Sequence, residues 1–424
     1  MERAGETSRP LVSIVAEEAR NGDRRRARRP SCTCFRGGAD QAMILFRAIV
    51  SRWPLIPLVI TPLAIAALAW ITRRWLPEGR GSGIPQVIAA SASPKRAPPA
   101  LLSLPIALAK LLMTCAALLV GASVGREGPT VQVSAAIMAR VHRYLRVPIT
   151  SGVIIAGGAA GVAAAFNTPL AGVVFAIEEL ANAFEQRVAM LVMSAIVISG
   201  IVSLGLAGDY VYFGAMPETL GISRVVLIAP VAGVLGGVAG GLFSRLVLAF
   251  TYNRTRLLGP FATRPVAWAF LCGLAIAAIG VATGLTWGTG YQAAKAIVEG
   301  AVAPWWFGLG KFAATLLSTV AGLPGGIFSP SLATGAGVGN VLCNIFPNDP
   351  RGAVVLLGMI AYFTGVVRAP LTAVIIIVEA TASRGLILPL FATAVIADAA
   401  GAMVCRDKLY HALSREFMAS PAKA

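Results

Sequence analysis

The chain has 424 residues, of which 57% are hydrophobic and only 13% are charged, and its mean hydropathy is +0.76. Soluble domains carry roughly a quarter charged residues, so this composition excludes an ordinary soluble protein and indicates a polytopic helical membrane protein. The net charge of +17 first suggests nucleic acid or anionic lipid as a partner. However, the Lys and Arg residues lie mainly between apolar runs, as they do in the cytoplasmic loops of membrane proteins, which argues against nucleic acid.

The first 40 residues are polar and rich in arginine, and their apolar stretch "LVSIVA" is too short for a secretory signal. We predict that 1–40 form a disordered cytoplasmic tail. A transmembrane domain is expected over 41–414, and a short C-terminal tail over 415–424.

Apolar runs follow along the chain, and several reach or approach the roughly 20 residues that a helix needs to cross hydrocarbon. These runs are 55–70, 100–124, 187–207, 225–250, 265–285, 353–378 and 385–404. Glycine-rich stretches interrupt many of them, at 157–161, 233–241 and 321–326. Such stretches predict broken helices that line a cavity, or helices that pack very closely.

The chain aligns with itself at an offset of 201 residues. "GREGP" (125–129) falls on "GIFSP" (326–330), and "NTPLAGVVFAIEE" (167–179) falls on "RAPLTAVIIIVEA" (368–380). In both halves the aligned prolines stand 40 positions apart. Two motifs in one ungapped register favour a duplication, with halves of about 41–207 and 225–405.

The loops that follow the two copies differ in charge. "ARVHRYLRV" (139–147) is strongly basic, whereas "CNIFPNDPRG" (343–352) is almost neutral. By the positive-inside rule the first loop is cytoplasmic and the second external, so the halves are predicted to be inverted. Inverted repeats with broken helices are typical of secondary transporters, in which helix N-termini point at an anion near the bilayer midplane. The predicted fold is therefore an all-α polytopic membrane protein with an inverted repeat and re-entrant helices.

The repeat separates carboxylates that both halves share from those that one half has alone. Glu178 is matched by Glu379, which indicates a role in the common fold, whereas Glu127 and Glu179 have no acidic counterpart. An ion pair with Arg126 is the plain alternative for Glu127, but adjacent helical residues do not face one another. For Glu179 the alternative is a helix-end carboxylate that reaches for water, and the sequence leaves both interpretations open.

No cofactor or metal site is expected. The chain has two histidines, His142 and His411, and its six cysteines are scattered without a C-x-x-C pair. An intramembrane enzyme is also not expected, because neither Ser329 nor Ser331 has a histidine or lysine base at a suggestive spacing.

Six motifs now follow one another in a recognisable order, and together they resemble the CLC family of chloride channels and chloride/proton antiporters, in its prokaryotic form without CBS domains. They are "GSGIPQ" (81–86), "GREGPTVQ" (125–132), "FNTPLAGVVFAIEE" (166–179), "GGIFSPSLATG" (325–335), "RAPLT" (368–372) and "KLYHAL" (408–413). One motif alone would be weak, but six in order with similar spacing are specific. The resemblance covers about 53–412.

The resemblance implies a central anion site, in which the hydroxyls of Ser82 and Tyr410 and the backbone N–H groups of Ile327 and Phe328 bind the ion. Neutral donors and helix ends hold an anion without trapping it, which conduction or exchange requires. By themselves, "GSG" is equally a flexible turn and Tyr410 an interfacial anchor. The resemblance adds further residues to the anion-binding set: Gly81, Gly83, Arg126, Gly325 and Gly326.

Glu127 resembles the family's gating glutamate, which competes with chloride for the anion site until it is protonated. Glu179 matches the internal proton carrier of the antiporters, and passive channels usually lack a carboxylate there, so antiport is favoured over a passive channel. Ser82 matches chloride-preferring members. The expected partners are chloride, protons and membrane lipid, with a homodimer as the assembly.

The N-terminus departs from the family pattern. Members open with a short amphipathic helix and a long apolar one, whereas here only 41–50 is apolar before Trp53. Either this chain dispenses with that helix or its N-terminal sequence is not the native one. The expected location is the cell membrane, a bacterial inner membrane, with the N-terminus in the cytoplasm.

Overall fold

The computed structural model describes residues 34–94, 98–180, 186–208 and 211–419. Within them the chain is helical, and its only β-type pairing is an isolated bridge between Gly125 and Gly326. The predicted all-α fold is confirmed. The helices of the first half are α2 (Cys34–Arg52), α3 (Pro57–Trp75), α4 (Ile84–Ala92), α5 (Leu104–Leu119), α6 (Glu127–Tyr144), α7 (Ser151–Phe166), α8 (Pro169–Phe175) and α9 (Gln186–Ala207).

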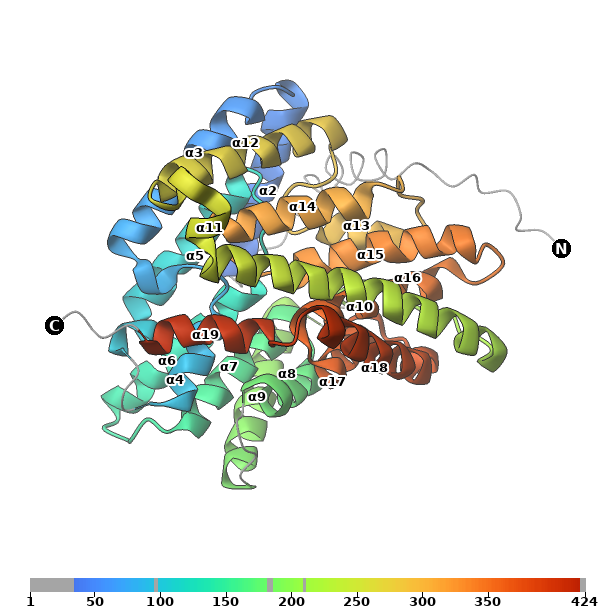
Figure 1. Cartoon of the computed structure of the whole chain (residues 1–424). Helices are drawn as coiled ribbons and strands as arrows, with labels where there is room; N and C mark the ends of the chain where they lie inside the picture. Colours follow the sequence, from blue (N-terminus) through green and yellow to red (C-terminus); the bar gives the residue numbers. More distant parts are fainter. Residues whose placement is uncertain (1–33, 95–97, 181–185, 209–210, 420–424) are drawn as a thin grey trace.

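The second half is longer. Its helices are α10 (Ile222–Tyr252), α11 (Arg254–Leu258), α12 (Pro265–Thr283), α13 (Tyr291–Val298), α14 (Phe307–Val320), α15 (Phe328–Ile345), α16 (Arg351–Val367), α17 (Pro370–Thr381), α18 (Ile387–Val404) and α19 (Leu409–Ala419). Most of them lie within one thick layer and run roughly along the same direction in Figure 1.

Four segments of the described chain are long and apolar enough to cross a membrane: Pro57–Trp75, Ile222–Tyr252, Pro265–Thr283 and Arg384–Val404. Five further apolar helices have only 10–17 residues, and a sixth apolar stretch, 189–203, lies within the 22-residue helix α9. A helix rises 1.5 Å per residue, so these shorter helices cover only part of a hydrocarbon layer about 30 Å thick. The chain is therefore a multi-pass membrane protein built from both complete and partial spans.

The offset of 201 residues found in the sequence is reproduced in the structure. α6 begins at Glu127 and α15 at Phe328, and both have 18 residues. The residues that end α7 and α16, Asn167 and Arg368, are both left-handed, with φ of 59° and 60°. The backbones of Gly125 and Gly326 donate to each other, at N···O distances of 2.6 and 2.7 Å, as equivalent residues beside a two-fold axis would. From this point α6 and α15 extend to opposite sides of the molecule, as inverted halves require (Figure 1).

The shared glutamates have the structural role that the repeat predicts. The Glu178 carboxylate accepts the backbone N–H groups of Leu371 and Thr372 at the start of α17, at 3.1 and 2.7 Å. The Glu379 carboxylate accepts those of Leu170 and Ala171 at the start of α8, at 3.2 and 2.8 Å. Each half thus supplies an acceptor for first-turn N–H groups of the other half that have no partner in their own helix.

Of the two alternatives that the glycine-rich stretches left open, close packing holds for two stretches and a helix break for the third. The glycines at 157–161 lie inside the continuous helix α7, and those at 233–241 lie inside α10. They serve close packing instead: a Cβ on Gly236 would lie 2.4 Å from the Cβ of Ala361 in α16, and one on Gly237 would lie 2.5 Å from the carbonyl of Ala397 in α18. Only 321–326 is a true break, between α14 and α15.

Both predicted tails need correction where the structure describes them. Residues 34–40 belong to α2, in which Ala39 is buried, so the tail does not extend to residue 40. The apolar stretch 41–50 is part of this same helix. Residues 415–419 continue α19, so the C-terminal tail does not begin at 415. The predictions for 1–33 and 420–424 lie outside the described residues.

Candidate anion site

Three helix beginnings meet near the centre of the molecule. α4 begins directly after Gly83, whereas one residue separates Gly125 from the start of α6 and one separates Gly326 from the start of α15. The N–H of Gly325 donates to the carbonyl of Gly81 at 3.1 Å, which ties the start of α15 to the start of α4. Glycine is required at Gly83, where φ is 113° and a Cβ would lie 2.5 Å from the carbonyl oxygen of Gly128. The unpaired N–H groups of these helix ends create positive potential in one small region.

A cavity of about 150 Å³ leads to this region and is lined by five of the predicted anion-binding residues. They are Gly81, Ser82, Gly325, Ile327 and Tyr410. The Ser82 and Tyr410 hydroxyls are buried and interact with each other, and neither has a further hydrogen-bond partner in the described part of the chain. A buried pair of hydroxyls with unused hydrogen-bonding capacity needs an explanation, and a bound anion would supply one.

The other predicted residues lie around the cavity rather than in its wall. The ring of Phe328 packs against the ring of Tyr410, with centroids 5.9 Å apart. Ile327 is the N-cap of α15 and Phe328 its first residue, so their N–H groups belong to the turn that has no intrahelical acceptors. Gly83 and Gly326 provide close backbone approach between helices.

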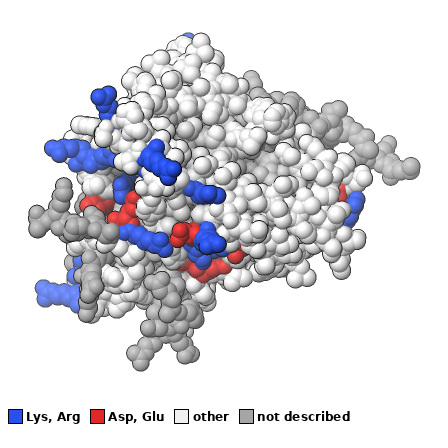
Figure 2. Space-filling model, viewed as in Figure 1, with Lys and Arg blue, Asp and Glu red and all other residues white. Residues whose placement is uncertain are grey.

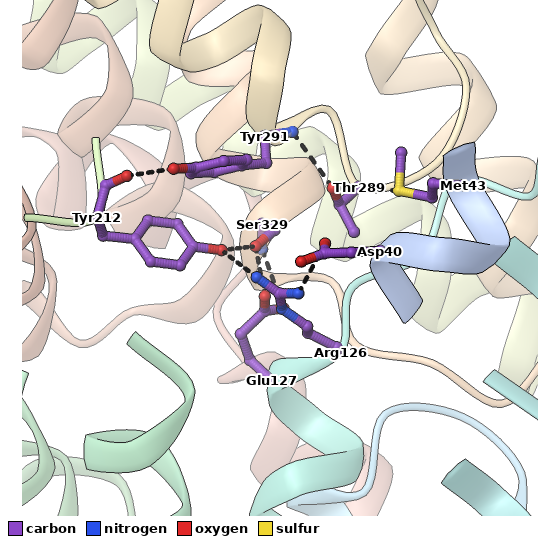
Figure 3. Close-up of polar contacts among 8 residues, drawn as sticks. All are labelled: Asp40, Met43, Arg126, Glu127, Tyr212, Thr289, Tyr291 and Ser329. Atoms are coloured by element: carbon purple, nitrogen blue, oxygen red, sulfur yellow. Dashed lines mark hydrogen bonds and ion pairs between the residues drawn. The ribbon is translucent and has the colours of Figure 1, made fainter. Parts of the chain in front are cut away.

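The Glu127 side chain is fully buried at the start of α6 and reaches across to the start of α15. The Ser329 hydroxyl donates to its Oε1, and the Ser329 backbone N–H donates to its Oε2 at 3.4 Å. Figure 3 shows this carboxylate and hydroxyl facing each other. The carboxylate therefore occupies a place at a helix N-terminus where an anion would otherwise be stabilised.

Arg126 does not point into the cavity. Its guanidinium pairs with the Asp40 carboxylate of α2 at 3.1 Å and donates to the Tyr212 hydroxyl at 3.5 Å (Figure 3). From the resemblance we predict that Arg126 binds the anion, but Arg126 does not line the cavity and its charge is directed to Asp40. The same geometry explains why a simple ion pair with Glu127 is not formed.

Glu179 is the other fully buried carboxylate, on a π-helical segment that follows α8. Its nearest basic groups are the Nζ of Lys408 at 4.0 Å and the Nε2 of His411 at 3.8 Å. Neither carboxylate oxygen has a hydrogen-bond partner among the described residues. Since Lys408 and His411 are both partly exposed, Glu179 lies close to solvent although it is itself covered.

The mouth of the cavity is strongly basic. Arg73, Arg80 and Arg254 line it, and Glu416 forms a 2.6 Å salt bridge with Arg80. On the face shown in Figure 2, Lys and Arg gather toward the end that carries α11 and α19, and few lie at the opposite end. The positive-inside rule predicts that an end with this excess of Lys and Arg faces the cytoplasm.

Several polar groups near the site were not found by sequence reasoning. Lys110 and Lys311 are buried at positions related by the same offset of 201 residues, and this signal could have found them. The Lys110 ammonium donates to the Gln132 side chain at 2.8 Å, and that of Lys311 to two backbone carbonyls. Tyr212 and Asp40 carry no comparable signal, because nothing in their local sequence marks them.

The fold and the site together define a membrane protein of the inverted-repeat transporter class, with a cavity where helix N-termini meet. The sequence profile described as voltage gated chloride channel matches residues 63–402, which is most of the chain. The protein belongs to this family, the CLC family.

Solved structures of the family have the same fold. The chain is 23% identical to a slow cyanobacterial Cl⁻/H⁺ antiporter, with a TM-score of 0.78 and 97% of each chain covered. It is 22% identical to a CLC-type fluoride/proton antiporter, with a TM-score of 0.74 and 95% of each chain covered. A eukaryotic CLC transporter is 22% identical, with a TM-score of 0.70, and the match covers 96% of this chain and 73% of that one.

Proposed function

We propose that this protein exchanges chloride for protons across a membrane, with Glu127 as the gate. The observation that carries the proposal is the position of the Glu127 carboxylate, which accepts the N–H and the hydroxyl of Ser329 at the start of α15. Hydrogen bonds to a charged group contribute about 1.5–3 kcal/mol, so the ionised carboxylate competes with a halide for the same donors. Protonation removes the charge and weakens the hydrogen bonds that hold the side chain at the start of α15.

The anion path then consists of the basic mouth, the cavity with the Ser82 and Tyr410 hydroxyls, and the place held by Glu127. The arginines at the mouth raise the local concentration of anions. Neutral hydroxyls further along bind chloride weakly enough for it to leave again. Chloride is the anion proposed here, with the hydroxyl of Ser82 as the residue that favours it.

Glu179 supplies the second half of the proposed exchange. It is buried and lacks hydrogen-bond partners among the described residues, and it lies within 4.0 Å of side chains that reach solvent. A carboxylate in this setting can accept a proton from the cytoplasmic side without joining the anion path, since it does not line the cavity. This is the feature that favours exchange over passive conduction.

The proposal is tested with purified protein in liposomes. An outward chloride gradient is expected to drive uphill proton uptake in wild type, and Glu127→Gln is expected to keep chloride flux while proton movement disappears. Chloride flux without proton movement in wild type would identify a passive channel on the same scaffold. Absence of both fluxes would refute anion transport.

We also propose a homodimer in the cell membrane, with the N-terminus in the cytoplasm. Helix α9 presents large exposed apolar side chains, among them Met190, Val197, Ile198 and Ile201, which a partner subunit or lipid must cover. Cross-linking of the protein in membranes, followed by gel analysis, distinguishes a dimer from a monomer.

A further inference from the structure

A chain of polar side chains leads from Glu127 to the α2 helix. The Ser329 hydroxyl contacts Glu127, the Tyr212 hydroxyl lies 3.5 Å from that of Ser329, and the Arg126 guanidinium lies 3.5 Å from the Tyr212 hydroxyl. Asp40 closes the chain through its 3.1 Å ion pair with Arg126. All are buried except Asp40, and Figure 3 shows them converging from separate segments.

The chemistry of the end groups fixes the direction of every hydrogen bond in this chain. A guanidinium can only donate, so the Tyr212 oxygen accepts from Arg126 and its own proton is available to Ser329. The Ser329 hydroxyl then donates its single proton to Glu127, because an ionised carboxylate can only accept. With an ionised Glu127, every donor in the chain points toward its carboxylate.

We propose that Ser329 and Tyr212 are positioning residues that hold the ionised Glu127 carboxylate at the start of α15 and release it when it is protonated. The inference rests on the proposed role of Glu127 as the gate and names the groups that set its response to pH. A protonated Glu127 brings its own O–H, so the carboxyl group no longer needs the donated proton and the charge-assisted part of the bond is lost. The proton that is to be transported thus destabilises the Glu127 side chain in its position at the start of α15.

Besides Ser329, other titratable or charged groups also interact electrostatically with Glu127. They are Arg126, the phenol of Tyr212 and Tyr410, and Asp40 acts through Arg126. None of them hydrogen-bonds the Glu127 carboxylate in the described structure, whereas Ser329 does so twice. Ser329 is therefore expected to have the largest effect.

The test measures chloride flux from liposomes as a function of external pH. Ser329→Ala removes only the hydroxyl, since the backbone N–H remains, and it should move the midpoint of the acid activation upward by about one pH unit. Tyr212→Phe keeps the ring that packs on Phe166 and Tyr291, and it should produce a smaller shift in the same direction. Tyr291→Phe is the matched control without a shift, because its hydroxyl donates to the backbone of Tyr212 and not toward Glu127.

The same substitutions in a Glu127→Gln background make the test specific. A glutamine does not titrate, so adding Ser329→Ala or Tyr212→Phe should leave the pH profile of that variant unchanged. A wild-type pH profile in both single variants would overturn the inference, and so would a shift that persists in the Gln background. Failure of the gate proposal itself gives a different result, since Glu127→Gln would then retain proton coupling.

Discussion

Glu178 and Glu179 are neighbours in the sequence, and substituting them one at a time is expected to give opposite results. Glu178 accepts three hydrogen bonds at the start of α17, from two backbone N–H groups and from the Thr372 hydroxyl at 2.8 Å. Glu179 accepts none from the described residues. The first therefore caps the start of α17, whereas the second makes no such contact and is the group that we propose carries protons.

The expected loss of stability in Glu178→Ala follows from those three hydrogen bonds. A hydrogen bond to a charged group contributes about 1.5–3 kcal/mol when buried, and this carboxylate is only partly buried, so Glu178→Ala should lower the free energy of unfolding by about 2–4 kcal/mol. Glu379→Ala provides the symmetric control, with a slightly smaller loss because two bonds are involved. For Glu179→Gln the expected change is smaller, since the substitution removes no hydrogen bond from the described residues.

Two measurements on the same preparations separate these roles. Thermal unfolding in detergent should show a lower midpoint for Glu178→Ala and an unchanged one for Glu179→Gln. In liposomes, Glu178→Ala protein that remains folded should keep its ratio of proton to chloride flux, whereas Glu179→Gln should lose at least tenfold of its proton flux and keep most of its chloride flux. The reasoning is refuted if Glu178→Ala uncouples a fully stable protein, or if Glu179→Gln is the variant that unfolds.

Two further substitutions test the cavity. Gly128→Ala would place a Cβ 2.3 Å from the Ser82 hydroxyl oxygen, so we expect chloride flux to fall by at least tenfold, whereas Gly205→Ala, with open space around it, should transport normally. Equal flux in both variants would contradict the close approach of α4 and α6. Arg254→Gln should raise the half-saturating cytoplasmic chloride concentration by roughly twofold to fivefold, because one positive charge leaves the mouth, and Glu416→Gln should lower it. Titrations of flux with chloride on one side measure both values. Shifts of the half-saturating concentration in the same direction would contradict an electrostatic effect at the mouth of the cavity.

The helix starts that surround the site could be predicted from the sequence because the internal repeat is visible there. The positions of Gly125, Gly326 and the two aligned helix starts follow from one offset, and the resemblance supplied Ser82 and Tyr410 for the cavity. These features depend on local backbone rules: glycine where chains approach closely, and free N–H groups where a helix begins. Because such rules act over only a few neighbouring residues, they produce short motifs that can be recognised in the sequence.

The rest depends on how distant segments come together. Tyr212 lies between the two halves of the repeat and Asp40 lies in α2, yet both are linked to Arg126. No spacing in the sequence relates them, because the contacts form only after the helices have packed. The glycines of α10 show the same limit: a run of small residues is compatible with a break or with a close helix crossing, and only the presence of neighbours such as α16 decides between them.

The asymmetry of the site arises from a symmetric frame. The reciprocal pairing of Gly125 and Gly326 puts two helix N-termini face to face, and each would stabilise an anion. In one half the first helical residue is Glu127, and in the other it is Phe328. The Glu127 carboxylate extends across the axis and accepts hydrogen bonds from Ser329 at the start of α15, whereas the ring of Phe328 packs beside Tyr410. Under the proposed function, divergence at this one pair of positions after a duplication converts two equivalent anion sites into one site and one gate that competes for it.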